Sequence, residues 1–193
     1  TASPGKRESV RRAEVNVDGL RMLLLNARSI RNKQAEFRCL VATEMPDLIS
    51  ITETWIQTDG ADFEGEFEIE GYNLFKKDRL ERRGGGVAIY VRNQLRSTRR
   101  TLDTPHEIIG VEIEGTARTI HVLLVYRPPH QTIDSDRSLY ELLTQLIRNK
   151  LAVIVGDFNC NVVWENRTAD AEGNRLVDFA NDNFLEQLVE EPT

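Results

Sequence analysis

The sequence has few of the residues that characterise disulfide-rich or zinc-binding proteins. Its 193 residues include two cysteines, Cys39 and Cys160, and three histidines, His106, His121 and His130. Two cysteines do not make a disulfide framework, so we expect free thiols in a reducing compartment. The histidines are too scattered for the usual ligand spacing of a zinc site, and a zinc enzyme is therefore not expected.

Long apolar runs are also absent. A membrane-spanning helix needs about 18 apolar residues, and no run approaches that length; the run from Val122 to Tyr126 is among the longest. The first twelve residues are polar and basic and contain no apolar signal core, so secretion is not expected. The chain begins with Thr rather than Met, and we expect it to be a fragment or a processed piece.

Charge is distributed unevenly along the chain. The net charge is −6, but Lys76 to Arg100 has nine Lys/Arg against two acidic residues, a local charge of +7. From Asp157 to Thr193 the balance is reversed, with nine acidic residues against two arginines. Nucleic-acid binding depends on local basic patches rather than on total charge, so the basic stretch is compatible with it. A solvated charged loop beside an acidic helix explains the same pattern.

The hydrophobic pattern predicts one mixed α/β domain rather than a purely doubly wound sheet. A strand, a helix and a strand near the start predict a parallel pair with a crossover, and the strand-rich middle favours antiparallel pairing. We expect residues 1–20 to be a flexible basic segment and residues 21–193 to form the domain. Strands are predicted at 21–26, 47–52, 72–75, 87–91, 108–113, 119–126 and 151–155, and helices at 29–44, 134–149 and 172–184.

The most informative segment is LAVIVGDFN, from Leu151 to Asn159. A continuous apolar strand ends at Gly156, and polar groups at a strand's carboxyl end project into the crevice where α/β proteins bind ligands. Residues two apart on extended chain point the same way, so Asp157 and Asn159 are expected to address one substrate group. The alternative is an Asx turn that merely caps the strand.

Three other strand-like runs also end in polar groups. Glu53 follows one of them, and a carboxylate there is a natural ligand for a hard cation such as Mg²⁺. Asn26 ends the run RMLLLN, and Tyr126 ends HVLLVY. Each residue alone is explained by solvation or capping. Together, four polar strand ends favour a functional crevice over four unrelated caps.

These segments, taken in order, resemble a known family. LLLNARSIRNK, PDLISITETW, RRGGGVAIYVR, LLVYRPP and VIVGDFN are similar to the endonuclease/exonuclease/phosphatase superfamily. Their wording is most like the apurinic-type endonuclease domain of non-LTR retrotransposons, particularly the Jockey-like group. The resemblance runs from about Arg21 to Thr193. It implies a layered α/β sandwich of two mixed sheets flanked by helices, with the final strands missing.

The resemblance also implies roles for the strand-end residues. Glu53 matches the metal-binding carboxylate and Asn26 its neighbour near the metal, with Mg²⁺ as the expected cofactor and Mn²⁺ as a possible substitute. Tyr126 would contact the phosphate or the nucleophile. Asp157 would orient or protonate reacting groups, and Asn159 would hold the scissile phosphate. The implied reaction nicks double-stranded DNA and leaves a 3′-hydroxyl that primes reverse transcription.

One part of the family pattern is not found in the sequence. The family's general base lies in a Ser-Asp-His motif near the end of the domain, preceded by another Asp, whereas this sequence stops at Glu191, Pro192 and Thr193. None of the three histidines lies in that context. Because attack by water without a positioned base typically loses about 10²–10⁴-fold in rate, we expect this chain to be weakly active or inactive.

The resemblance implies that the basic stretch contacts DNA. Phosphate contacts position DNA without reading its sequence. The residues expected to contact DNA are Arg79, Arg82, Arg83, Arg127 and Thr193, and those that would extend the track are Arg92, Arg96, Arg99 and Arg100. A solubilising loop beside an edge strand protected by charge is the alternative.

Two other functions stay open at this point. A phosphatase of the same superfamily, acting on phosphoinositides or phospholipids, would keep the metal site and change the substrate. A degenerate copy would bind DNA or a protein without catalysis. If the retrotransposon interpretation holds, a reverse transcriptase is expected in the same polyprotein, and the protein is expected in both nucleus and cytoplasm, with no membrane partner.

Overall fold

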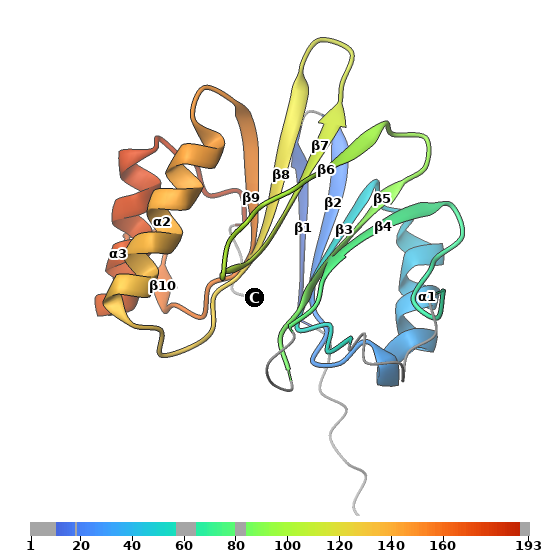
Figure 1. Ribbon diagram of the computed structural model, residues 1–193, viewed down its shortest axis with the longest axis horizontal. Helices are drawn as coiled ribbons and strands as arrows, with labels where there is room; N and C mark the ends of the chain where they lie inside the picture. The colour runs from blue at the N-terminus through green and yellow to red at the C-terminus, as the bar shows by residue number, and fades with distance from the viewer. Residues whose placement is uncertain (1–10, 18, 57–64, 80–83, 190–193) are drawn as a thin grey trace, which may run out of the picture.

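The architecture is a sandwich of two mixed β-sheets with helices on its outer faces (Figure 1). The structure, a computed structural model, describes residues 11–17, 19–56, 65–79 and 84–189. The fold class expected from the sequence is confirmed. No helix among these described residues has the length and apolar character needed to cross a membrane.

Within the described residues, one sheet has five strands in the order β1-β2-β3-β5-β4. Strands β2 and β3 are parallel, and the other pairs are antiparallel. The short helix η1 (Arg31–Lys33) and α1 (Gln34–Glu44) connect β2 to β3, which confirms the predicted crossover. The strands are β1 (Arg11–Val17), β2 (Leu20–Asn26), β3 (Leu48–Thr52), β4 (Tyr72–Lys77) and β5 (Val87–Arg92).

The second large sheet of the described chain has four strands in the order β6-β7-β8-β9. Strands β8 and β9 are parallel and are connected through α2 (Ile133–Ile147), while the other pairs are antiparallel. A small β10-β11 hairpin and α3 (Ala171–Asp182) follow. The strands are β6 (Ser97–Arg100), β7 (Glu107–Glu114), β8 (Thr119–Tyr126), β9 (Leu151–Asp157), β10 (Val162–Val163) and β11 (Thr168–Ala169).

Three apolar layers hold these elements together. The central layer lies between the two sheets and includes Leu48, Ile89 and Val122, all fully buried. A second layer packs α1 against the five-stranded sheet, and a third packs α2 and α3 against the four-stranded sheet. Figure 1 shows the helices on the two outer faces, with α1 on one side and α2 and α3 on the other. Because the two sheets pack face to face, ends of strands from both sheets lie along one rim of the sandwich.

The expected boundary at residue 20 needs correction. Residues 11–17, which were expected to be part of a flexible segment, form β1 and pair with β2 along its whole length. Strands β6, β10 and β11 were not predicted either. All of these strands are polar or very short. Main-chain hydrogen bonds do not depend on an apolar pattern, so an edge strand such as β1 gives a weak signal in the sequence.

The layer under α2 makes a direct stability prediction. Leu143 is fully buried in it, so replacement by Ala is expected to lower the free energy of unfolding by about 2–5 kcal/mol. Ile133 lies on the same helix but is 61% exposed. Its replacement by Ala is expected to cost less than about 0.5 kcal/mol. Urea denaturation of both variants checks this, and equal losses would contradict the assigned packing of α2.

Candidate active site

Four strand ends meet at one rim of the sandwich, as the sequence predicts. Parallel pairing places Asn26 at the end of β2 opposite Thr52, and Glu53 follows directly. In the other sheet, Tyr126 at the end of β8 pairs with Asp157 at the end of β9. Because each parallel pair runs in one direction, its polar ends arrive at the same height. Face-to-face packing of the two sheets then brings the pairs together.

Hydrogen bonds join these side chains across the two sheets. The Asn26 amide nitrogen Nδ2 donates to Asp157 Oδ2 at 2.7 Å and to Glu53 Oε1 at 3.5 Å. The Tyr126 hydroxyl donates to Glu53 Oε1 at 3.1 Å. Trp55 Nε1 donates to the other carboxylate oxygen of Glu53, Oε2, at 3.3 Å. The two carboxylates thus lie side by side around one amide, partly exposed to solvent.

The segment after β3 has an unusual backbone conformation. Glu53 and Trp55 both have left-handed φ angles, of 52° and 54°. The Trp55 amide nitrogen donates to the Gly85 carbonyl at 3.0 Å, which attaches this segment to the glycine run before β5. Such conformations cost energy in residues other than glycine and persist only when the surroundings enforce them. In this conformation the Trp55 indole donates a hydrogen bond to the Glu53 carboxylate.

The turn after β9 behaves partly as expected. A side chain at Gly156 would collide with the carbonyl oxygen of Val125 on β8, so the close strand approach requires glycine. Asp157 Oδ1 accepts a hydrogen bond from the Asn159 amide nitrogen at 3.1 Å, which is the Asx turn that the sequence left open. Asp157 also faces Asn26 through its other oxygen, so it both caps the turn and belongs to the site.

The expectation that Asp157 and Asn159 point the same way assumed an extended chain. Asn159 instead has a left-handed φ of 48°, and its amide donates to the Arg127 carbonyl at 2.8 Å. The two side chains therefore have different partners in this arrangement. Asn159 stays exposed at the rim, beside the cluster of carboxylates.

Tyr126 lies between the Glu53 carboxylate and the guanidinium group of Arg79. The Arg79 guanidinium carbon lies 5.6 Å from the centre of the Tyr126 ring. Arg79 is paired with Glu107 at the start of β7, through Nε at 2.8 Å and through Nη2. The other oxygen of Glu107 accepts from the Gly86 amide nitrogen at 2.7 Å. Arg79 thus lies at the site, as expected, but its charge is largely engaged by Glu107.

Burial raises the pKa of Tyr126 above its ordinary value, and the neighbouring Glu53 carboxylate raises it further. Both effects disfavour a phenolate: a buried charge lacks hydration, and the carboxylate repels a second negative charge. Tyr126 is therefore a hydrogen-bond donor at neutral pH. It is unsuited to act there as a base.

Arg127 requires a correction. The sequence interpretation placed it among the DNA contacts, but its side chain is fully buried. Its Nε donates to Asp136 Oδ1 at 2.6 Å, and its Nη2 donates to Glu172 Oε2 at 2.9 Å. A guanidinium enclosed by two carboxylates has no surface to offer to a phosphate. The packing of α2 and α3 encloses the side chain.

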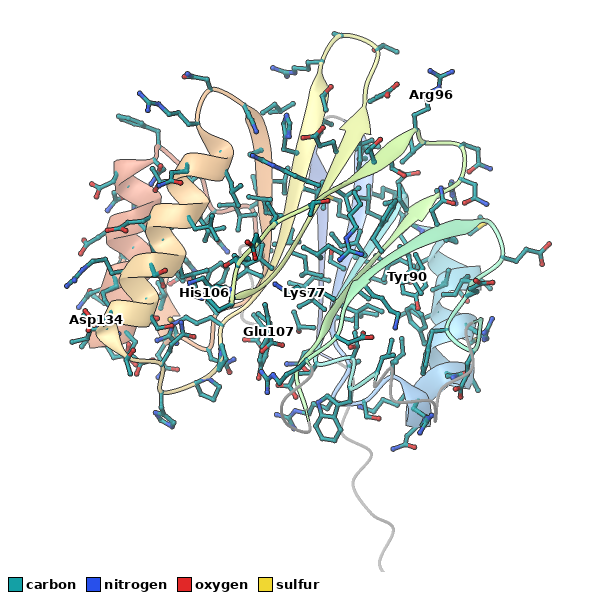
Figure 2. All side chains as sticks on the ribbon, viewed as in Figure 1. Lys77, Tyr90, Arg96, His106, Glu107 and Asp134 are labelled. Carbon is teal, nitrogen blue, oxygen red and sulfur yellow. The ribbon has the colours of Figure 1, made fainter. Side chains whose placement is uncertain are left out.

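The basic stretch divides between two ends of the molecule. Arg79 lies at the active-site end, but Arg92 and Arg96 lie at the other end, where they pair with Asp47 and Glu114. Figure 2 shows Arg96 far from Glu107. Strand β5 runs antiparallel to β3, so its end is carried away from the site, and the proposed extension of the track through Arg92 and Arg96 is wrong.

Of the remaining expected DNA contacts, Arg82, Arg83 and Thr193 lie outside the described residues. Arg99 and Arg100 lie on the edge strand β6, where Arg100 donates to the Leu146 carbonyl of α2 at 3.2 Å. Neither arginine belongs to the hydrogen-bonded group of Asn26, Glu53, Tyr126 and Asp157. Their contribution to DNA binding stays a prediction.

The histidines have other surroundings. His106 hydrogen-bonds to Ser138 of α2 at 3.2 Å, and His121 faces Glu112 on the neighbouring strand β7. His130 is exposed in the loop between β8 and α2. In the described part of the chain, no histidine hydrogen-bonds to Asn26, Glu53, Tyr126 or Asp157.

The donor set suits a hard cation. Glu53 and Asp157 supply carboxylate oxygens that open to solvent, and Mg²⁺ binds through one or two carboxylates while it keeps several waters. Asn26 turns its amino group toward both carboxylates, and its oxygen accepts from the Arg28 amide nitrogen at 3.3 Å. Among the described residues, no group of three or more His, Cys, Asp and Glu side chains is placed to hold a metal ion. Asn26 would need to rotate its amide to bind the metal.

Sequence reasoning missed several residues of this site. The Trp55 indole donates a hydrogen bond to Glu53, which no motif in the sequence indicates. Glu107 begins a strand and has no motif around it, yet it anchors Arg79 and Gly86. Asp136 resembles an ordinary acidic residue in the first turn of a helix. These roles depend on contacts between distant segments, which no local pattern contains.

Comparison with known proteins agrees with the fold. The model of the Endonuclease/Exonuclease/phosphatase family matches residues 14–179. A solved structure of the endonuclease domain of TRAS1, a telomere-specific non-LTR retrotransposon, is similar with a TM-score of 0.69 and 21% identity; the match covers 89% of this chain and 76% of that one. Comparison with curated proteins gave no match.

Two AP endonucleases are also similar in structure. LMAP from Leishmania major has a TM-score of 0.63 at 15% identity, over 84% of this chain and 66% of that one. The enzyme from Archaeoglobus fulgidus has a TM-score of 0.61 at 20% identity, over 84% of this chain and 70% of that one. At these identities the likeness concerns the fold.

The surroundings of Tyr126 predict its titration. Because its folded pKa is raised above 10.0, it stays protonated while an unfolded chain would lose the proton, so its contribution to stability falls as pH rises above 10. Ultraviolet difference titration of the folded protein is expected to give overlapping curves for the wild type and Tyr126→Phe up to about pH 10.5. A tyrosinate signal missing from Tyr126→Phe below that pH would contradict the assigned environment.

Proposed function

Because the chain belongs to the endonuclease/exonuclease/phosphatase family, we propose that it provides the metal and phosphate site of a DNA endonuclease. The observation that carries this proposal is the convergence of four polar strand ends from two sheets. Asn26, Glu53, Tyr126 and Asp157 are joined there by hydrogen bonds of 2.7–3.5 Å. An oxygen-rich group of this kind is suited to a hard cation and a phosphodiester.

Glu53 is the proposed metal ligand, because its carboxylate is oriented by two donors from different segments. A bound Mg²⁺ would stabilise negative charge on the phosphate and on the leaving oxygen. Tyr126 keeps its proton and would donate a hydrogen bond toward the phosphate. Asp157, held by Asn26, would orient or protonate a reacting group, and the exposed Asn159 amide would hold a phosphate oxygen.

DNA is the proposed substrate. The RGGGVAIYVR and VYRPP segments support it, as does the structural likeness to the TRAS1 endonuclease domain. The glycine run that follows the basic residues is attached to the site through Trp55 and Glu107. The proposed reaction nicks target DNA and leaves a 3′-hydroxyl that primes reverse transcription. A reverse transcriptase in the same polyprotein, with a nuclear and cytoplasmic location, belongs to this proposal.

Activation of the attacking water is the weak point of this site. Among the described residues, His106 contacts Ser138, His121 faces Glu112 and His130 is exposed in a loop, so none of the three histidines is placed as a base at this site. Reactions of this kind typically lose about 10²–10⁴-fold without a positioned base. We therefore propose that the 193-residue chain holds metal and phosphate but cleaves slowly.

A plasmid assay tests activity directly. With Mg²⁺ and long incubation, the chain is expected to nick supercoiled plasmid slowly, and Glu53→Ala is expected to reduce this residual rate by about 100-fold or more. Equal rates for both proteins would contradict a Glu53-dependent site. Rapid nicking that Glu53→Ala abolishes would overturn the proposal of weak activity. Faster turnover of a phosphoinositide than of plasmid would favour the phosphatase alternative.

DNA affinity provides a separate test with a charge-matched control. Replacing both Arg82 and Arg83 by Ala is expected to weaken binding to duplex DNA and to reduce the slope of log K against log salt by about 2. Replacing both Arg92 and Arg96 by Ala removes the same charge at the end of the fold away from Glu53. The control is expected to leave the slope nearly unchanged. Equal effects of the two double variants would contradict DNA binding at the active-site end.

A further inference from the structure

A group of four charged side chains, two fully buried and two partly exposed, lies next to the turn that follows β9. Arg127 donates to Asp136 through Nε at 2.6 Å and through Nη2 at 3.0 Å, and its Nη2 also reaches Glu172 at 2.9 Å. Arg175 donates to the same Asp136 through Nε at 2.9 Å. Two guanidinium groups therefore balance two carboxylates, and we call these four residues the charge cluster.

Burying the charge cluster carries a large desolvation penalty. Arg127 and Asp136 are fully buried, so both charges lose their hydration and only their pairing offsets that loss. Apolar side chains of similar volume often stabilise a protein as well or better. A role in positioning explains the cluster better than a contribution to stability alone.

Arg127 also contacts three consecutive residues of the turn that follows β9. Its Nη1 donates to the Phe158 carbonyl at 3.1 Å, and its backbone amide donates to the Asp157 carbonyl at 2.9 Å. Its own carbonyl accepts from the Asn159 amide side chain at 2.8 Å. One residue thus holds both backbone and side chain of the turn that carries Asp157 and Asn159.

The other members of the charge cluster fix Arg127 in turn. Asp136 lies in the first turn of α2 and Glu172 in the first turn of α3, so the starts of both helices converge on one guanidinium. The planar guanidinium can make all of these bonds at once, because its five N–H donors form a rigid fork. A lysine at this position would keep the charge but could not reproduce the fork.

We propose that Arg127 is a positioning residue, which transmits the placement of α2 and α3 to the turn of Asp157 to Asn159. Its partners Asp136 and Glu172 set its orientation. Its hydrogen bonds to the Asp157 and Phe158 carbonyls, and the bond it accepts from the Asn159 amide, then fix the turn that points the Asp157 carboxylate at Asn26. The consequence for catalysis rests on the proposed function, whereas the effect on the turn does not.

Cys160 gives a reporter for the turn that is independent of catalysis. Its thiol donates to the Phe158 carbonyl at 3.2 Å, the same carbonyl that Arg127 binds, and it is half-buried. With Cys39 replaced by Ser, Cys160 is the single thiol of the 193-residue sequence. Its labelling rate with a thiol reagent then measures how often the turn opens.

The decisive comparison is Arg127→Lys against Arg175→Lys, both with Cys39→Ser. Each variant keeps the charge and loses one guanidinium that binds Asp136, but only Arg127 contacts the turn. Arg127→Lys is expected to raise the labelling rate of Cys160 by about tenfold, and Arg175→Lys by less than about twofold. Equal rises, or no rise with Arg127→Lys, would overturn the proposal.

Two further measurements protect this test. Circular dichroism establishes that each variant is folded; if Arg127→Lys does not fold, Glu172→Gln replaces it, with an expected rise of about threefold. An unchanged rate in Glu172→Gln would overturn the proposal.

In the plasmid assay, Arg127→Lys is expected to lower kcat by about 100-fold and to leave KM for DNA within about twofold. A rise in KM at constant kcat would contradict a positioning role. If the wild type nicks no better than Glu53→Ala, the proposed function fails, while the labelling comparison still decides the role of Arg127.

Discussion

The hydrogen bond from Asn26 to Asp157 connects residues 131 positions apart in the chain and joins the two sheets at their rim. Each partner ends a strand of a parallel pair, so the bond depends on the crossovers through α1 and α2 that make those pairs parallel. It also depends on the apolar layer that presses the sheets together. In this arrangement the Tyr126 hydroxyl donates to Glu53 Oε1 at 3.1 Å.

Around this bond, positive charge is used mainly to hold the site in position. Arg79 is paired with Glu107 and lies over the Tyr126 ring, while Arg127 is enclosed by Asp136 and Glu172. A guanidinium paired with carboxylates orients the groups that it binds, and its positive charge is balanced by theirs. In the proposed function, a cation bound by the carboxylates would provide the positive charge for a phosphate.

The sequence predicts those residues of the site whose position follows from a short segment of the chain. Glu53 and Asp157 follow apolar strands, so their convergence could be inferred from strand direction alone. The fate of Arg127 could not, because its burial depends on two helices that reach it from different parts of the chain. Arg96 was misplaced for a related reason: neighbours in sequence separate when an antiparallel strand carries one of them to the far end of the sheet. Polar edge strands such as β1 escaped notice because main-chain pairing leaves no apolar pattern.

The proposed function depends on a cation site at the meeting point of the two sheets, with Glu53 as its ligand and Asn26 beside it. Paramagnetic line broadening by Mn²⁺ tests it most directly, since the effect falls steeply with distance from the bound ion. At low Mn²⁺ occupancy, the account predicts selective loss of the amide signals of Asn26, Glu53 and Asp157, and recovery of these signals in Glu53→Ala. Broadening centred on the acidic helix α3, or unchanged by Glu53→Ala, would contradict it.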